Sequence, residues 1–173
     1  MTKIPGDYIA GFVDGEGCFA LKFRRDVRRE RISAPTYFYW DIEFIIALRN
    51  DDREILEKIR DTIGCGTVRV TQKEARYTVN ALENLQNMVV PFFEKFPLRA
   101  KKRHDFELWK EALSLLNKNK GKKTGISSTG NRRGARKETW APNELGRVKE
   151  IIEAMRPYKS KRTELRWLKE VHL

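Results

Sequence analysis

Apolar residues along the chain follow two spacings, one typical of helices and the other typical of strands. Residues 5–13 are apolar at helical spacing, and Pro5 suits the first turn of a helix. From Cys18 to about Arg28, apolar and polar residues alternate, which predicts a strand. The alternation returns from Tyr37 to Arg49, with one apolar face and one mixed face. Such a strand packs one face on helices and leaves the other face open.

The remaining elements follow the same rules. Asp51 or Asp52 begins a predicted helix that runs to about Ile63 and ends at the glycines of residues 64–66. Further elements are expected as a hairpin of strands 67–71 and 75–80, and as helices 83–93, 100–116, 142–155 and 160–171. The order is therefore helix, two strands, helix, two strands, helix, followed by further helices.

This order predicts an α+β fold with an αββαββα core. The core would be a curved four-stranded antiparallel sheet with helices on one face, followed by C-terminal helices. Residues 1–116 would form the core, and residues 142–173 a helical extension packed on it. Residues 117–141 between them are rich in Gly, Lys, Arg and Ser, and bury too little apolar surface to fold alone.

The charge of the chain changes the picture from fold to function. The net charge is +12 and the isoelectric point is near 9.8, which favours a polyanionic partner. The charge is also uneven, because thirteen Lys or Arg residues stand against four Asp or Glu between Pro97 and Trp140. A charged, solubilising surface is the alternative, but it explains a local excess of one sign less well. Nucleic acid is therefore the predicted partner.

Composition also argues against several classes of protein. No run of apolar residues is long enough to span a membrane, and we find no apolar region of a secretory signal at the start of the sequence. Two cysteines are too few for a disulfide framework or a zinc site. We therefore expect an intracellular protein without a membrane partner, cytoplasmic in a prokaryote or located in an organelle matrix.

One segment carries more chemistry than any other. Residues 8–19 place two carboxylates, Asp14 and Glu16, among glycines, after an apolar helix and before a strand. Glycine allows a tight turn and a close approach of two backbones. A carboxylate held there can face a metal, a phosphate or the end of a helix. The alternative is a short core helix that ends at a glycine turn.

The stretch Ile9 to Gly17, I-A-G-F-V-D-G-E-G, resembles the nine-residue signature of the LAGLIDADG homing endonucleases. Two further stretches are similar to that family in the right order. Residues 55–66 resemble its second helix and the following turn, and residues 96–103 resemble the segment before its third helix. The resemblance covers Pro5 to about Leu116, and it implies the αββαββα fold with the sheet as a DNA-binding saddle.

The resemblance also implies an assembly and a site. Family members with one copy of the motif work as homodimers, so Ala10, Gly11 and Gly15 would let the helix pack on its symmetry mate. Asp14 would lie near the N-terminus of the partner helix, where an anion is favoured. Glu16 would ligate a divalent cation with help from the Gly17 carbonyl. Oxygen ligands suit Mg²⁺, and Mn²⁺ or Ca²⁺ could occupy the same site.

Two other positions matter for catalysis in the family. Lys101 falls where the family has a lysine near the reactive water, with Lys102 and Arg103 as adjacent alternatives. The family often has a polar residue near the end of the second strand, where this chain has Leu48; Arg49 or Asn50 could substitute for it. This is the position at which the chain departs from the family pattern.

The open face of the sheet would supply hydrogen-bonding groups to base edges in the major groove. Its predicted DNA-binding residues are Lys22, Arg24, Arg28, Tyr39, Asp41, Glu43, Thr67, Arg69, Thr71, Arg76, Thr78 and Asn80. The basic stretch after the core would contact phosphates, which gives affinity rather than sequence information. Its predicted contacts are Lys120, Lys122, Lys123, Arg132, Arg133 and Arg136.

The resemblance thus implies a metal-dependent, site-specific endonuclease for double-stranded DNA. It would be encoded in an intron, cut a long pseudo-palindromic target as a homodimer and leave short 3′ overhangs. The first alternative is a maturase that binds intron RNA, or a regulator that binds DNA without cutting it. A generic RNA-binding protein without a metal site is the weaker one. Retention of Glu16 favours cleavage, because a protein that only binds has no need of a metal ligand.

Overall fold

The computed structural model describes residues 3–27, 29, 36–122 and 139–158. A helix and two strands come first, and a second helix and a hairpin follow them, as the sequence predicts. The main elements are α1 (Gly6–Glu16), β1 (Gly17–Val27), β2 (Thr36–Leu48), α2 (Arg53–Ile63), β3 (Thr67–Val70), β4 (Ala75–Val79), α3 (Leu82–Asn84), α4 (Val90–Lys95), α5 (Lys102–Lys118) and α6 (Pro142–Met155). Short 3₁₀ turns at 50–52 and 156–158 flank α2 and α6.

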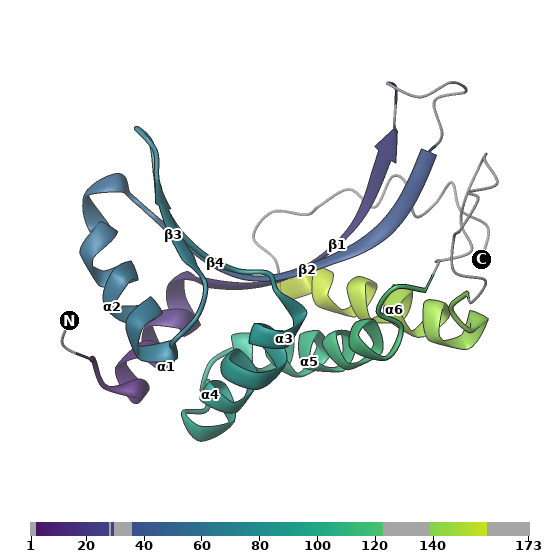
Figure 1. Ribbon diagram of the computed structural model, residues 1–173. Coiled ribbons are helices and arrows are strands. Elements are labelled where there is room, and N and C mark those ends of the chain that lie inside the picture. The colour runs from purple at the N-terminus through teal and green to yellow at the C-terminus, as the bar shows by residue number, and fades with distance from the viewer. Residues whose placement is uncertain (1–2, 28, 30–35, 123–138, 159–173) are drawn as a thin grey trace.

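The four strands form one antiparallel sheet in the order β1-β2-β4-β3. The strand β2 pairs with β1 along most of its length, but with β4 only from Phe44 to Leu48. Figure 1 shows the sheet bent into a saddle, with the helices on its convex side and the concave side open. The predicted α+β fold with a curved four-stranded sheet is confirmed.

An aromatic cluster joins the sheet to the helices. The ring of Phe19 in β1 lies 5.2 Å from that of Phe44 in β2, 5.5 Å from Phe93 in α4 and 5.3 Å from Trp109 in α5, measured between centroids. All four side chains are at least 98% buried. Aromatic pairs at these distances add to the large apolar area that each ring buries. The cluster therefore fixes α4 and α5 against the middle of the sheet.

The motif helix is longer than predicted. The sequence predicted a helix that ends at Val13 and is followed by a glycine turn, but α1 continues through Asp14 and Gly15 to Glu16. Gly17 then begins β1 with an extended backbone, at φ −74°. The need for glycine at 17 is steric, because a Cβ there would lie 2.5 Å from Val13 Cγ1 and 2.9 Å from the Val13 carbonyl oxygen. The last helical turn passes directly into the strand without a loop.

The predicted helix 83–93 is irregular. Residues Leu85–Val89 form a π-helical segment between α3 and α4. Pro91 follows it, and a proline within a helix has no N–H to donate and clashes with the carbonyl four residues earlier. A widened turn relieves that clash, and such single π turns occur inside α-helices.

The helix α6 packs on α5 through its buried Leu145, Val148 and Ile152. At the edge of this contact, Arg147 donates two hydrogen bonds to the Glu111 carboxylate, at 2.6 and 2.9 Å. The predicted helix 160–171 and most of the basic stretch 117–141 lie outside the described residues. The division into domains stays a prediction. Within the described part of the chain, no helix is long and apolar enough to cross a membrane.

The tight passage from α1 to β1 gives a test of the fold. We expect Gly17→Ala to lower the free energy of unfolding by about 1–3 kcal/mol, because the side chain and the carbonyl group of Val13 leave no room for a methyl group. Gly146→Ala is the matched control. A Cβ at 146 meets nothing within 4 Å, so alanine there should stabilise α6 by roughly 0.5–1 kcal/mol. Urea denaturation measures both, and equal stability of the two variants would contradict the assignment.

Candidate active site at the junction of α1, β1 and α5

The end of α1 is bound to the start of α5 by a carboxylate. Asp14 Oδ2 accepts hydrogen bonds from the backbone N–H groups of Arg99, at 2.8 Å, and Ala100, at 3.2 Å. These amides lie just before α5, where N–H groups lack helical partners and an anion is favoured. The sequence predicted Asp14 at a helix N-terminus but assigned it to a partner chain. The structure shows these two contacts within one chain, and in the described part of that chain Asp14 Oδ1 is buried without a hydrogen-bond partner, so a contact with a partner helix stays a prediction.

A lysine joins the same two elements. Lys102, the first residue of α5, donates a hydrogen bond from Nζ to the carbonyl oxygen of Gly17. Its side chain is partly buried, whereas that of Lys101 is exposed. The lysine beside the motif is therefore Lys102, one of the two adjacent alternatives, and a catalytic role for Lys101 stays a prediction. Successive helical residues differ in direction by about 100°, so this single step decides which lysine faces the motif.

Glu16 stands next to this contact at the end of α1. Its side chain is exposed, and within the described residues the structure gives it neither a hydrogen bond nor an ion pair. The described residues contain no cluster of three His, Cys, Asp or Glu side chains that could hold a metal. One chain thus offers the Glu16 carboxylate and the Gly17 carbonyl, which are two oxygen ligands of the kind that Mg²⁺ accepts. The donors fit a cation whose other ligands are waters, phosphate oxygens or groups of a second chain.

The end of β2 provides no polar side chain for this site. Leu48 is partly buried and packs on the core. Arg49 is ion-paired with Asp51 at 2.9 Å, and Asn50 Nδ2 donates to the carbonyl of Gln72 at 3.0 Å. Both proposed substitutes for a polar residue at 48 thus have partners other than Glu16.

Charged side chains on the concave face of the sheet are paired with one another. Lys22 in β1 forms an ion pair with Glu43 in β2, and Arg24 pairs with Asp41 at 3.3 Å. Partial burial lowers the pKa of Lys22, against the opposing effect of Asp41. The cations of Arg24 and Arg76 lower it further. A phosphate or a guanine edge would therefore meet cations held in place by carboxylates.

The other half of this face is less strongly paired. Thr67 in β3 lies opposite Thr78 in β4, and Arg69 lies opposite Arg76. Arg76 also contacts Glu74 at 3.1 Å. The structure thus brings most predicted sheet residues to one face, with Tyr39, Thr71 and Asn80 exposed at its margins. Five predicted DNA contacts lie outside the described residues, namely Arg28, Lys123, Arg132, Arg133 and Arg136.

The helix α1 has a second exposed face with small and aromatic residues. Tyr8 and Phe12 stack with ring centroids 6.2 Å apart, and 52% of Tyr8 is exposed. A Cβ at Gly11 or at Gly15 would meet nothing within 4 Å, so nothing in the single chain requires glycine there. Ala10 differs, because it is only 3% exposed and packs inside its own chain. Little of Ala10 is therefore open to a partner helix, and its place in the interface stays a prediction.

The fold and the junction can now be compared with known proteins. The model of the family described as LAGLIDADG endonuclease matches residues 9–113, which is more than half of the chain. The chain belongs to the LAGLIDADG endonuclease family. This match contains the junction of α1 and β1, the concave face of the sheet and most of α5.

Relatives of this LAGLIDADG chain include proteins from introns. It is 34% identical over 123 residues to an uncharacterized 50.9 kDa protein in ND4 intron 1 of Podospora anserina, covering 69% of this chain and 26% of that protein. The chain thus spans about a quarter of that curated relative. Among solved structures, the homing endonuclease I-TnaI matches with a TM-score of 0.73 and 26% identity, over 99% of this chain and 100% of that one.

A second solved structure shows the same fold in a longer chain. I-SmaMI bound to an uncleaved DNA target in the presence of calcium ions matches with a TM-score of 0.66 and 18% identity. The match covers 87% of this LAGLIDADG chain but only 44% of I-SmaMI. The present fold therefore corresponds to about half of the I-SmaMI chain.

Sequence reasoning missed two parts of the site. It did not single out Tyr8 and Phe12, although their spacing of four residues places them on one helical face beside Gly11 and Gly15. It also could not assign the two backbone N–H donors of Asp14, which are 85 and 86 residues away. The face with Tyr8 and Phe12 could have been predicted from the helical spacing. The donors to Asp14 depend on how the whole core packs.

Proposed function

We propose that this protein is a homing endonuclease that cuts both strands of a specific DNA site. The observation that carries the proposal is the arrangement at the end of α1, where exposed Glu16 stands beside the Gly17 carbonyl and Lys102. Membership of the LAGLIDADG endonuclease family and the relative within an intron support it. The proposed reaction is hydrolysis of one phosphodiester in each strand.

The proposed cofactor is Mg²⁺, with Mn²⁺ or Ca²⁺ able to take its place, and Glu16 and Gly17 would hold it. A bound divalent cation lowers the pKa of a coordinated water and stabilises charge on the leaving oxygen. Lys102 would hold the Gly17 carbonyl in position and place a positive charge close to the scissile phosphate. Asp14 keeps the helix that carries Lys102 in register with the end of α1.

A homodimer is the proposed assembly. Gly11 and Gly15 leave open space on α1, and Tyr8 and Phe12 beside them are the kind of side chain that a second protein surface covers. Two copies of α1 crossing at these glycines would bring the two Glu16 side chains together. The match of this chain to about half of I-SmaMI supports two copies of the fold in the active unit.

Two saddles side by side would hold a long, nearly palindromic DNA target. A two-stranded β-ribbon fits the major groove, where every base pair presents its own pattern of donors and acceptors. The cross-strand ion pairs on the concave face would give up or share their cations as the DNA arrives. Cleavage across the minor groove between the two halves would leave short 3′ overhangs.

The first prediction concerns the metal ligand. We expect Glu16→Gln to keep its affinity for DNA that carries the intron insertion site and to lose double-strand cleavage in Mg²⁺ by at least about 10²-fold, because an amide binds a divalent cation poorly. Gel-shift and cleavage assays on the same duplex separate the two effects. The control is Asp7→Asn, an exposed acid in the first turn of α1.

Normal cutting by Glu16→Gln would show that the metal ligand is wrongly assigned. If wild-type protein bound the insertion-site DNA but never cut it in Mg²⁺, the protein would be a regulator. Preference for the intron RNA over that DNA would indicate a maturase.

The second prediction separates the two adjacent lysines. Lys102→Met should reduce the single-turnover cleavage rate by about 10²-fold or more, because it removes the charge next to Gly17. Lys101→Met should cut within about threefold of the wild-type rate, because that side chain is exposed and loses only a surface charge. Equal rates for the two variants would contradict the assignment of Lys102. The unchanged thermal stability of both variants should exclude misfolding.

The third prediction concerns the dimer. We expect Gly11→Gln to sediment as a monomer under conditions in which the wild-type protein sediments as a dimer, because the new side chain fills space that the partner helix needs. Within the folded chain, a Cβ at Gly11 would meet nothing within 4 Å. Gly146→Gln in α6 is the matched control and should remain dimeric. A dimeric Gly11→Gln variant would show that the subunits meet elsewhere.

A further inference from the structure

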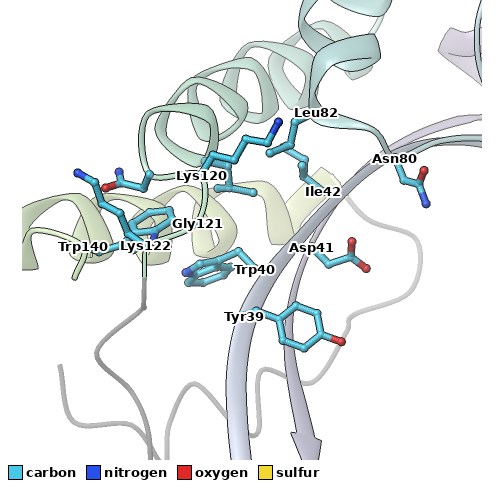
Figure 2. A pocket seen from close by; sticks show the side chains of 12 residues that line it. Tyr39, Trp40, Asp41, Ile42, Asn80, Leu82, Lys120, Gly121, Lys122 and Trp140 are labelled. Atoms are coloured by element: carbon cyan, nitrogen blue, oxygen red, sulfur yellow. The ribbon is translucent and has the colours of Figure 1, made fainter. Parts of the chain in front are cut away.

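A cavity of about 280 Å³ lies at the edge of the saddle, away from Glu16. It exists because β4 leaves β2 at Phe44, and the chain turns away at Asn80 into α3. The end of α5 and Trp140 close the other side (Figure 2). Tyr39, Asp41 and Asn80 from the concave side of the sheet line its rim, so it opens beside the surface that DNA would cover.

Two polar groups in the wall of this cavity lack partners. Trp40 is 9% exposed, and its indole Nε1 is buried without a hydrogen-bond acceptor. Asn119 is 2% exposed, and its Oδ1 is buried without a donor. The orientation of the Asn119 amide is fixed, because Nδ2 donates to the Leu115 carbonyl at 3.0 Å and to Glu144 at 2.9 Å. A buried polar group without a partner is costly, so an additional molecule in the cavity would stabilise both groups.

The charges around the cavity favour an anion. Lys120 and Lys122 line it from the turn after α5, where Gly121 takes a positive φ of 81°. Figure 2 shows Lys120 at one side of the opening and Lys122 near Trp40 and Trp140. Asp41 is the acid in the lining, and its charge is partly balanced by Arg24 at 3.3 Å. Ammonium groups commonly contact DNA phosphates, and the indole N–H is a further hydrogen-bond donor.

We infer that this cavity binds one backbone phosphate of the DNA that flanks the saddle. A phosphate oxygen would accept from Trp40 Nε1 while Lys120 and Lys122 neutralise its charge, and an ordered water would donate to Asn119 Oδ1. The inference rests on the proposed function in that the ligand is DNA. It adds an anchoring point that is independent of sequence and separate from the groups that cut. Such a contact sets affinity and register rather than the choice of bases.

The test uses the full-length protein and a duplex of about forty base pairs with arbitrary sequence, because phosphate contacts do not depend on sequence. Binding is measured at several salt concentrations without divalent metal. Trp40→Phe removes the indole N–H but keeps an aromatic ring next to Phe23, whose centroid lies 4.7 Å away. We expect it to bind about three- to tenfold more weakly with an unchanged salt dependence, because a neutral donor releases no counterion.

The lysines should change the salt dependence instead. Lys120→Gln and Lys122→Gln should each reduce the slope of log K against log salt, by about one in total for the double variant, because the two cations together would neutralise one phosphate. Lys95→Gln is the matched control, an exposed lysine on α4 on the helical side of the molecule. It should leave the slope unchanged. Lys120 is also exposed, so its replacement does not depend on the fold tolerating a change at Trp40.

Other results would overturn the inference. If Trp40→Phe bound DNA as tightly as wild type, the cavity would hold only structural water, whatever the change in thermal stability. Equal slopes for the Lys95, Lys120 and Lys122 variants would exclude a phosphate there. Weaker binding to an RNA duplex with unchanged binding to DNA would assign the cavity to RNA. All these measurements are of binding, so loss or retention of cleavage in Glu16→Gln decides the proposed function separately.

Discussion

The site depends on a connection between two segments that are far apart in the sequence. Asp14 accepts hydrogen bonds from two backbone N–H groups at the entry to α5, and Lys102 at the start of α5 also donates one to the Gly17 carbonyl. The Asp14 side chain reaches the backbone before α5, and the Lys102 side chain reaches the backbone after α1, so the end of α1 and the start of α5 cannot slide or rotate independently. A carboxylate at a helix N-terminus and an ammonium on a carbonyl are both charge-assisted hydrogen bonds, which are the stronger kind. They hold Glu16 at the surface instead of in the core.

Most of the fold could be predicted because local rules agree with the tertiary structure. The alternation in β2 places Trp40, Ile42, Phe44 and Ile46 on the buried face, and the spacing in α2 places Leu56, Ile59 and Ile63 there. Gly64 ends α2 with a positive φ of 91°, as glycine commonly does. The register between β1 and β2 follows from one buried face, since a shift of one residue would expose every core side chain.

The site was harder to predict for a physical reason. Which of Lys101, Lys102 and Arg103 faces the motif depends on the residue at which α5 begins, and this is set partly by Asp14 from 85 residues away. A run of basic residues carries no signal for that choice. The predicted end of α1 at Val13 was wrong for a similar reason, because Gly15 and Gly17 indicated a turn there. The actual limit is steric, at the contact of Gly17 with Val13.

Glycines in one short segment therefore have different causes, and only the structure separates them. Gly17 is required inside the chain, because its own helix fills the space where a Cβ would lie. Gly11 and Gly15 have open space around them, so glycine there lowers the helical propensity of α1 without any gain inside the chain. Exposed Tyr8 and the partly buried Phe12 that stacks on it extend the same surface. Residues that weaken a helix and expose aromatic rings are explained if a second α1 covers them. The same contact would place two Glu16 carboxylates where two strands of DNA can be cut.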